Sequence, residues 1–363
     1  MLRCMYSGIS GMRVNQTKLD VIGNNIANVG TTAFKSSQAR FKDMLYQNAG
    51  EATAPTSTKG GTNAKQVGLG AQLSSINKMM GQGNALSTGR SLDVCVDGDG
   101  YLLVGKGLVD YAGGNTVDNN NALTSATGDT GVMDILYTRD GNLTLDKDGN
   151  LLTADGYRVM GYAVTDSTSA AATKNATSFD ATTGKVLKVD ADAVTSAGKS
   201  ALATVGTYGA KKLVPLKIPD TIYATAAGAA ATPPTGGQAV KKFEIGKDGL
   251  VTAILGDGSR AAIGQIAMAT FKNPEGLTSV GGNYLQKSSN SGQEIIKTGI
   301  GEATANDNSK GFGDFIQGAL EGSNVDLTEQ FTDMITATRS FQAASKMITT
   351  GDEILQTVTG LMR

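Results

Sequence analysis

Hydrophobic residues recur at every seventh position at both ends of this chain. Near the N-terminus these positions are held by Met5, Met12, Leu19 and Ile26, with Leu2 and Ile9 on the flanking position. Near the C-terminus they are held by Leu327, Met334, Phe341, Ile348, Leu355 and Met362. This spacing lines the side chains up in one narrow seam, which a single helix cannot bury by itself. The sequence therefore predicts that the two terminal helices pack against each other.

The first helix is expected over residues 2–28, and the last is expected to begin near Asp326, whose carboxylate can accept hydrogen bonds from free amides of the first turn. An apolar stripe at helical spacing is more often an ordinary core face. Both stripes here are terminal and narrow, and the second continues to Met362, so we interpret them as a stem that associates with copies of itself or with partners. Mostly small residues stand three positions after the C-terminal seam and would admit a close neighbour: Ala337, Ala344, Gly351 and Val358.

The charge balance argues against two classes of partner. Lys and Arg number 32 and Asp and Glu number 33, which gives a net charge of −1. Such a chain has no bulk attraction to nucleic acid or to an acidic membrane surface. No stretch approaches the roughly 18 consecutive apolar residues of a spanning helix. We expect no nucleic-acid partner and no membrane insertion.

The residue types needed for most enzyme chemistry are scarce. The chain contains no histidine, the commonest general base and metal ligand. Cys4 and Cys95 lie in apolar stretches and are expected to be buried thiols. Residues 146–150 begin like a calcium loop, but Leu151 replaces the required glycine and Tyr157 the bidentate glutamate, so a β-turn is expected. The sequence predicts a protein that is not an enzyme, with no catalytic residue, cofactor or metal.

Between the two ends the pattern changes from helix to strand. Short apolar runs alternate with Asp-Gly pairs, a strong hairpin signal because left-handed turn angles cost least at these residues. The sequence predicts one antiparallel β domain built from two separated segments, residues 73–165 and 241–319. The Asp-Gly pairs begin at Asp97, Asp99, Asp140, Asp148, Asp155, Asp248 and Asp257.

The predicted architecture is mixed α and β and multidomain. Residues 1–30 and 320–363 are expected to form the stem, as a coiled coil. Residues 31–72 are expected to be a linker with a short helix or loop, because an amphipathic stretch is followed by a segment rich in Gly, Thr and Ser. Residues 166–240 contain few large apolar side chains and are expected to form an inserted, outer β-rich domain.

Several motifs resemble those of the bacterial flagellar rod and hook proteins. They include MLRCMYSGISGM at residues 1–12 and LDVIGNNIANV at 19–29 near the start, and GALEGSNVDL at 318–327 near the end. Ala33 stands where this family usually has glycine, so the turn after the first helix is expected to differ. The residues of this chain that match the family motifs are Asn24, Asn25, Asn28, Phe34, Lys35, Ser323, Asn324, Val325, Asp326 and Leu327.

The resemblance implies a structural role. Members of this family are exported by the flagellar type III apparatus and polymerise outside the cell, in the flagellum. The similarity to hook proteins is strongest around residues 60–70, and implies a curved tube of identical subunits that acts as a universal joint between rod and filament. Its implied partners are further copies of the chain, the distal rod protein, the hook cap and the hook-filament junction proteins. A distal rod protein is the alternative, and a secreted adhesin with a trimeric helical stalk is a more remote one.

Overall fold

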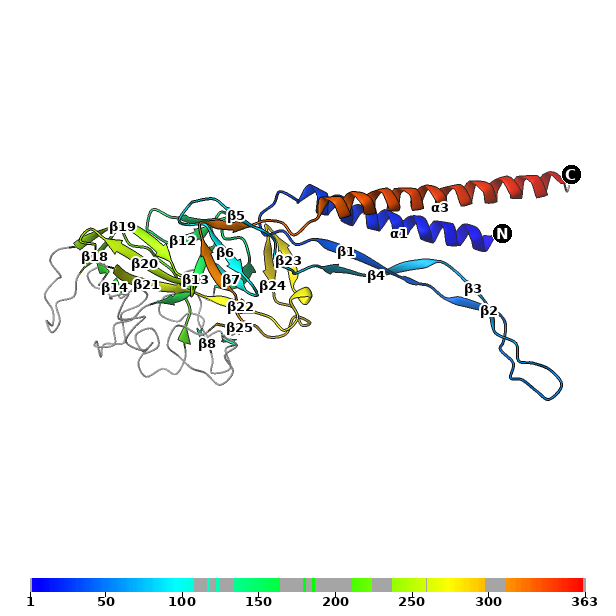
Figure 1. Cartoon of the computed structure of the whole chain (residues 1–363), viewed down its shortest axis with the longest axis horizontal. Coiled ribbons are helices and arrows are strands. Elements are labelled where there is room, and N and C mark those ends of the chain that lie inside the picture. The colour runs from blue at the N-terminus through cyan, green and yellow to red at the C-terminus, as the bar shows by residue number, and fades with distance from the viewer. Residues whose placement is uncertain are drawn as a thin grey trace. The chain divides into compact units, whose positions relative to one another are not determined.

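The computed structural model describes residues 2–107, 116–117, 122–124, 133–163, 179–180, 185–186, 211–223, 237–258, 260–297 and 311–361. The chain divides into two compact units, the first made of residues 1–81 and 323–363 and the second of residues 82–322. A helix lies at each end of the sequence and a large β-sheet region is formed by the middle (Figure 1). The mixed α and β fold class is thereby confirmed. The domain boundaries expected from the sequence stay predictions.

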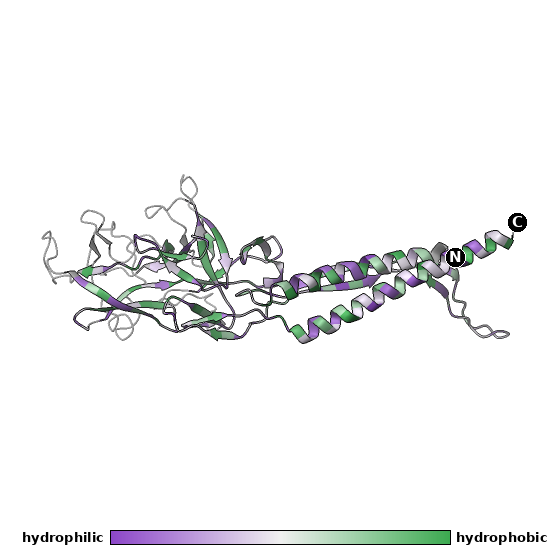
Figure 2. Ribbon diagram, turned by 90° about the horizontal axis from the view of Figure 1, so that it is seen from above, coloured by the Kyte–Doolittle hydropathy of each residue, from purple (hydrophilic) through white to green (hydrophobic). Residues whose placement is uncertain are grey.

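Two long helices of the first unit, α1 (Leu2–Ala27) and α3 (Leu327–Leu361), run antiparallel and side by side (Figure 1). The end of α1 falls one residue before the predicted limit. Asp326 caps α3, since its Oδ1 accepts a hydrogen bond from the backbone N–H of Thr328 at 2.8 Å. Both helices mix hydrophobic and hydrophilic residues along their whole length (Figure 2).

A two-stranded ribbon follows α1. The predicted short helix in this segment was wrong, because exposure alternates from Ser37 to Phe41, with Ala39 and Phe41 half-buried and Arg40 exposed. That period of two belongs to a strand. The segment expected to be a long loop forms the distal part of the same ribbon. Its antiparallel pairs are β1 (Ser37–Asp43) with β4 (Ala71–Lys78), and β2 (Tyr46–Gly50) with β3 (Lys65–Gly68).

The second unit is dominated by a 14-stranded sheet in which every described pairing is antiparallel. Its main path runs through β18 (Thr221–Tyr223), β19 (Gly237–Ile245), β20 (Leu250–Leu255), β21 (Arg260–Ile266), β13 (Arg158–Ala163), β7 (Tyr101–Lys106), β10 (Asp134–Thr138), β24 (Tyr284–Gln286) and β23 (Thr278–Gly281). Its branches are β11 (Leu143–Leu145), β12 (Leu151–Thr153), β17 (Val214–Pro215), β22 (Met268–Thr270) and β25 (Ile295–Ile296).

Smaller elements complete this unit. The pair β5 (Ala85–Ser87) with β27 (Ala319–Glu321) and the pair β6 (Val94–Asp97) with β26 (Asp314–Gln317) join residues far apart in the sequence. The remaining described elements are β8 (Thr116–Val117), β9 (Leu123–Thr124), β14 (Phe179–Asp180), β15 (Lys185–Val186), β16 (Lys211–Lys212) and the short 3-10 helix η1 (Pro274–Gly276).

Four of the seven Asp-Gly pairs form hairpins as predicted. The prediction was wrong at Asp97, Asp99 and Asp140, because the strands that flank them, β6 with β7 and β10 with β11, pair with other strands instead. Gly149, Gly156, Gly249 and Gly258 have φ values between 80° and 84° and lie between β11 and β12, β12 and β13, β19 and β20, and β20 and β21. Glycine carries no Cβ to disfavour this left-handed conformation. Residues 146–150 are one of these turns, as expected, because Gly149 N–H donates to Asp146 O at 2.9 Å.

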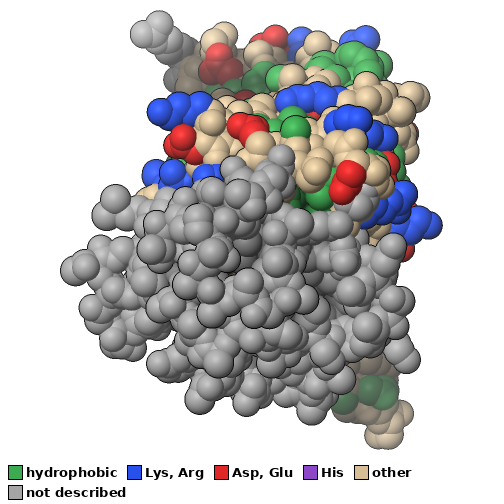
Figure 3. Space-filling model, turned by 90° about the vertical axis from the view of Figure 1, so that its left-hand side faces the viewer, with side chains coloured by type: hydrophobic (Ala, Val, Ile, Leu, Met, Phe, Trp, Pro, Cys, Tyr) green, Lys and Arg blue, Asp and Glu red, His purple; other side chains and the backbone are tan. Residues whose placement is uncertain are grey.

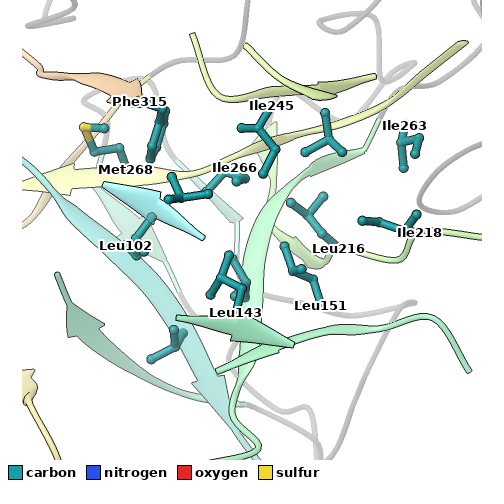
Figure 4. Close-up of a cluster of buried hydrophobic side chains, with 14 of the residues drawn as sticks. Leu102, Leu143, Leu151, Leu216, Ile218, Ile245, Ile263, Ile266, Met268 and Phe315 are labelled. Carbon is teal, nitrogen blue, oxygen red and sulfur yellow. The ribbon is translucent and has the colours of Figure 1, made fainter. Parts of the chain in front are cut away.

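The core of the second unit includes residues that were expected to lie in the separate outer insertion. Leu216 and Ile218 are 3% and 7% exposed and lie near Leu151 in the main cluster of buried side chains (Figure 4). Their segment pairs with the sheet through β17. Leu216, Ile218 and Ile222 of the predicted insertion thus belong to the main core. Most of residues 166–210 and 224–236 lie outside the described residues.

Candidate assembly site on the terminal helices

Glycines allow the two helices to approach closely. A Cβ added to Gly8 of α1 would lie 3.3 Å from Ile348 Cγ1 and 3.4 Å from Ala344 O of α3. A Cβ added to Gly351 would lie 3.2 Å from Met5 Cγ. These spacings are tighter than ordinary van der Waals contact, so the absence of side chains at the two glycines sets the distance between the helices.

Polar contacts fix the register of the same pair. Lys18 Nζ lies 3.1 Å from Asp333 Oδ1, with both side chains partly exposed. Asn25 Nδ2 donates to Gln330 Oε1 at 3.0 Å. A half-exposed ion pair contributes about 0–1 kcal/mol. These contacts therefore set how α1 and α3 are aligned along each other, and they add little to the free energy of unfolding.

Two family-motif residues of the N-terminal segment form buried hydrogen bonds. Asn25 is 1% exposed, donates to Ser37 O at 2.8 Å and accepts from Ser37 N–H at 2.9 Å. Lys35 is also buried, and its Nζ donates to Gly81 O at 2.8 Å. The intervening turn contains Ala33 at φ 54°, a left-handed conformation that glycine adopts more readily. The departure from the family pattern at this position thus falls on a strained residue.

Asn324, just before α3, joins these segments to the other end of the chain. Its Oδ1 accepts from Ser36 N–H at 2.7 Å, and its Nδ2 donates to Met79 O at 2.6 Å and Gly81 O at 3.2 Å. We call Asn25, Lys35 and Asn324 the polar clasp. It ties the end of α1, the base of the ribbon and the start of α3 together.

The predicted seam residues lie mainly where the helices meet. The half-buried ones are Met5, Ile9, Met12, Leu19, Ile26, Met334, Phe341, Ile348 and Leu355. Leu327 is 39% exposed, and Met362 lies outside the described residues. The most deeply buried apolar side chain of α1, Ile22, was not among the seam residues. Ile22 stands four residues before Ile26, and residues four apart lie on the same face of a helix. A pattern that takes only every seventh residue does not include Ile22. The role of the seam in assembly stays a prediction.

Other family-motif residues make hydrogen bonds close to the ends of the two helices. Asn28 Nδ2 donates to Asn24 O at 2.9 Å at the end of α1, and Phe34 O accepts from Asn324 N–H at 3.4 Å. Ser323 Oγ accepts from Val325 N–H at 3.3 Å just before α3.

Large apolar side chains of α3 remain exposed off the predicted seam. They are Phe331, Ile335, Met347, Ile354, Val358 and Leu361, with exposed fractions between 41% and 82%. A chain that folds alone rarely leaves so long an apolar series in water. Phe331 and Ile335, and Ile354 and Val358, stand four residues apart, but none of these residues belongs to the predicted seam.

Gly351→Val is expected to destabilise the helix pair by about 1–3 kcal/mol, because the new branched side chain would collide with Met5. Thermal unfolding followed by far-UV circular dichroism would measure the loss. Gly360→Val is the matched control, since nothing lies within 4 Å of a Cβ at that position. Equal losses for the two variants would contradict close packing at Gly351.

Asn324→Ala is expected to destabilise the first unit by about 1–3 kcal/mol, because Ser36 N–H and Met79 O lose their partner. Faster amide hydrogen exchange at Ser36 and Ser37 would report the change. Asn48→Ala removes an exposed hydrogen bond to Gln66 and is expected to change little. Unchanged exchange in the Asn324→Ala chain would rule out the polar clasp as an ordering element.

The described residues outside the helices offer packing rather than reactive groups. Burial raises the pKa of Tyr101 to about 12, and its ring packs edge-on against Phe271, with 6.0 Å between the ring centroids.

Cys95 is buried as expected, but Cys4 is exposed on α1, because its position faces a flank of the helix pair. Among the described residues no group of His, Cys, Asp and Glu could hold a metal ion, and no helix could cross a membrane. The described part of the face in Figure 3 carries interspersed basic and acidic side chains.

Three family models match the chain. Residues 5–35 match the flagella basal body rod protein model, residues 128–253 the flagellar hook protein FlgE/F/G D1 domain, and residues 316–361 the flagellar basal body rod FlgEFG protein C-terminal model. The flagellar basal-body rod protein FlgG of Bacillus subtilis is 36% identical over all of both chains. The flagellar hook protein FlgE of Borreliella burgdorferi is 30% identical over 99% of this chain and all of its own.

This chain belongs to the flagellar rod and hook protein family. The structure of the Helicobacter pylori flagellar hook protein FlgE2 is similar with a TM-score of 0.36, at 12% identity, over 65% of this chain and all of that one. The polar clasp joins the two terminal segments that match rod-protein models, since Asn25 and Lys35 lie in one and Asn324 in the other. A family motif split between the two ends of the sequence is therefore one cluster in space.

Proposed function

We propose that the chain is a structural subunit that polymerises through its terminal helices into the flagellar hook. The observation that carries the proposal is the series of exposed apolar residues on α3, which has 35 residues against 26 in α1. Because α3 is the longer helix, its C-terminal turns extend past α1 (Figure 1), and the described residues 352–361 are exposed except for Leu355. Neighbouring copies would cover these turns.

We further propose that α1 and α3 form a short antiparallel coiled coil. Its support is the heptad series Met334, Phe341, Ile348 and Leu355, each half-buried. Isolated helices are marginal in water, so this stem would gain order mainly when neighbours pack on it. Such a chain suits export in an unfolded state through the flagellar type III apparatus, followed by assembly outside the cell.

The hook is favoured by a comparison within one organism. The hook protein FlgE of Borreliella burgdorferi is 30% identical to this chain, and the rod protein FlgG of the same organism is 26% identical, each over nearly the whole chain. In a hook the subunit would contact copies of itself, the distal rod protein, the hook cap and the hook-filament junction proteins.

The distal rod is the second candidate. The 36% identity to the Bacillus subtilis rod protein FlgG extends over an alignment of 363 residues. The alignment to the Borreliella burgdorferi FlgE runs over 474 positions, so it contains long gaps.

Electron microscopy of basal bodies from a strain that lacks the chain separates the two. Rods that end without hooks are the expected result, and return of the chain on a plasmid should restore curved tubes. Truncated rods would instead assign the chain to the distal rod. Intact hooks and rods, or purified chains that form trimers with a helical stalk, would contradict an axial role.

A further inference from the structure

The first and last strands of the second unit pair with each other. Among the described pairings, β27 is the only strand partner of β5, and β26 is the only strand partner of β6. The partners are far apart in the sequence, since the nearby hydrogen bond from Gln317 Nε2 to Ser91 O spans 226 residues. We call residues 312–322, which contain β26 and β27, the closing strap.

Phe315 anchors the closing strap in the core. Its side chain is 2% exposed and lies near Met268 in the main cluster of buried side chains (Figure 4). Its backbone N–H donates to Lys247 O at 2.9 Å. A Cβ added to Gly249 would lie 2.6 Å from Phe315 Cε2, so the turn between β19 and β20 packs directly against the ring. The strap therefore contacts a hairpin from the middle of the unit as well as its first strands.

The far end of the strap is fixed by a buried charge and by the backbone. Glu321 Oε2 lies 2.9 Å from Arg139 Nε, and Glu321 Oε1 accepts from Gly83 N–H at 2.9 Å. Gly322 N–H donates to Asn84 O at 2.8 Å. Without the strap, Arg139 would be a buried cation that has lost its counter-charge, which is strongly unfavourable.

The strand β6 shows what else depends on the strap. Val94, Cys95 and Val96 are each 0% exposed. Without β26 the backbone of this strand would lose its ladder of hydrogen bonds, and its apolar side chains would lose the cover of Phe315. A buried strand with unpaired backbone groups is not stable. The loss of the strap thus reaches the interior of the unit.

We propose that the second unit folds only when the closing strap has docked. A long loop has to close before the contacts of the strap can form, so its entropy delays docking. The strap and its partner strands lie at opposite ends of the unit's sequence. A chain that has only partly left an export channel therefore lacks one of them, whichever end leaves first, and the unit stays unfolded until its whole sequence is outside. This consequence for export rests on the proposed function, whereas the dependence of folding on the strap does not.

Hydrogen exchange of the full chain, followed by mass spectrometry of peptides, tests the proposal. Peptides from the strap, β7 and β20 should be protected equally, within about tenfold, because all three lose their structure in one opening. Phe315→Ala should speed exchange in all three by the same factor, roughly 100-fold or more. Ile316→Ala is the matched control, because this neighbouring side chain is 39% exposed. It should speed exchange less than about tenfold.

Pulse labelling of amides during refolding from urea gives a second measurement. The strap, β7 and β20 should gain protection in the same kinetic phase. If Phe315→Ala leaves no folded chain, Phe315→Leu makes the same comparison with a smaller loss, because leucine keeps part of the apolar contact.

The outcomes separate this inference from the proposed function. A strap that exchanges roughly 100-fold faster than β7 would open by itself and would overturn the proposal. Protection of β7 and β20 while the strap is still exposed during refolding would also overturn it. Both results leave the axial role intact, since neither measurement involves assembly. Intact rods and hooks in the strain that lacks the chain would overturn the proposed function and leave the folding result standing.

Discussion

Removal of residues 327–363 is expected to abolish polymer formation while the second unit remains folded. The deletion takes away α3 and with it the partner of α1. Residues 82–322 keep their own core, which contains side chains such as Leu102, Val159 and Ile266 with 0–2% exposure. Electron microscopy of the secreted chain would show no tubes, and circular dichroism would retain the β signal.

A shorter deletion is the control for this experiment. Removal of residues 358–363 leaves in place the close contacts between the helices at Gly8, Gly11 and Gly351. We expect this chain to fold its helix pair and to assemble less well rather than not at all. Tubes built by the chain without residues 327–363 would contradict assembly through the terminal helices.

Glu321→Gln is expected to lower the free energy of unfolding of the second unit by about 3–5 kcal/mol, because it leaves the Arg139 cation buried without its counter-charge. Glu321 Oε2 lies 2.9 Å from Arg139 Nε, and the two side chains are 0% and 4% exposed. Arg139 also donates to Gly98 O at 2.6 Å, and Glu321 Oε1 accepts from Gly83 N–H at 2.9 Å. Urea unfolding would measure the loss.

Two comparisons make this result specific. Glu244→Gln removes one partner of the exposed pair with Lys242 and is expected to cost about 0–1 kcal/mol. Replacement of both buried partners, by Arg139→Met with Glu321→Leu, should cost less than Glu321→Gln alone, because no unpaired charge remains. A Glu321→Gln chain as stable as the parent would show that the charge of Glu321 is not needed.

Features encoded by neighbouring residues could be predicted from the sequence. The hairpins at Asp148, Asp155, Asp248 and Asp257 were predictable because the turn conformation depends only on the Asp and Gly residues of the turn itself. The terminal helices were also predicted, since their apolar spacing repeats over many turns. The ribbon was missed, because Phe34 and Phe41 are seven residues apart and this spacing matched the helical template.

Features that depend on distant contacts could not be predicted from local patterns. Asn25, Lys35 and Asn324 entered only through the family resemblance, because the bond from Asn324 to Ser36 spans 288 residues of sequence. Likewise, the repeat of every seventh residue predicted which side of α3 faces α1. It did not predict that Phe331 and Ile335 are exposed, because their exposure depends on where α1 packs against α3.

The chain passes twice between its two units, once after Gly81 and once after Gly322. Because there are two crossings, a single cut at either one leaves the β unit covalently joined to one of the two terminal helices.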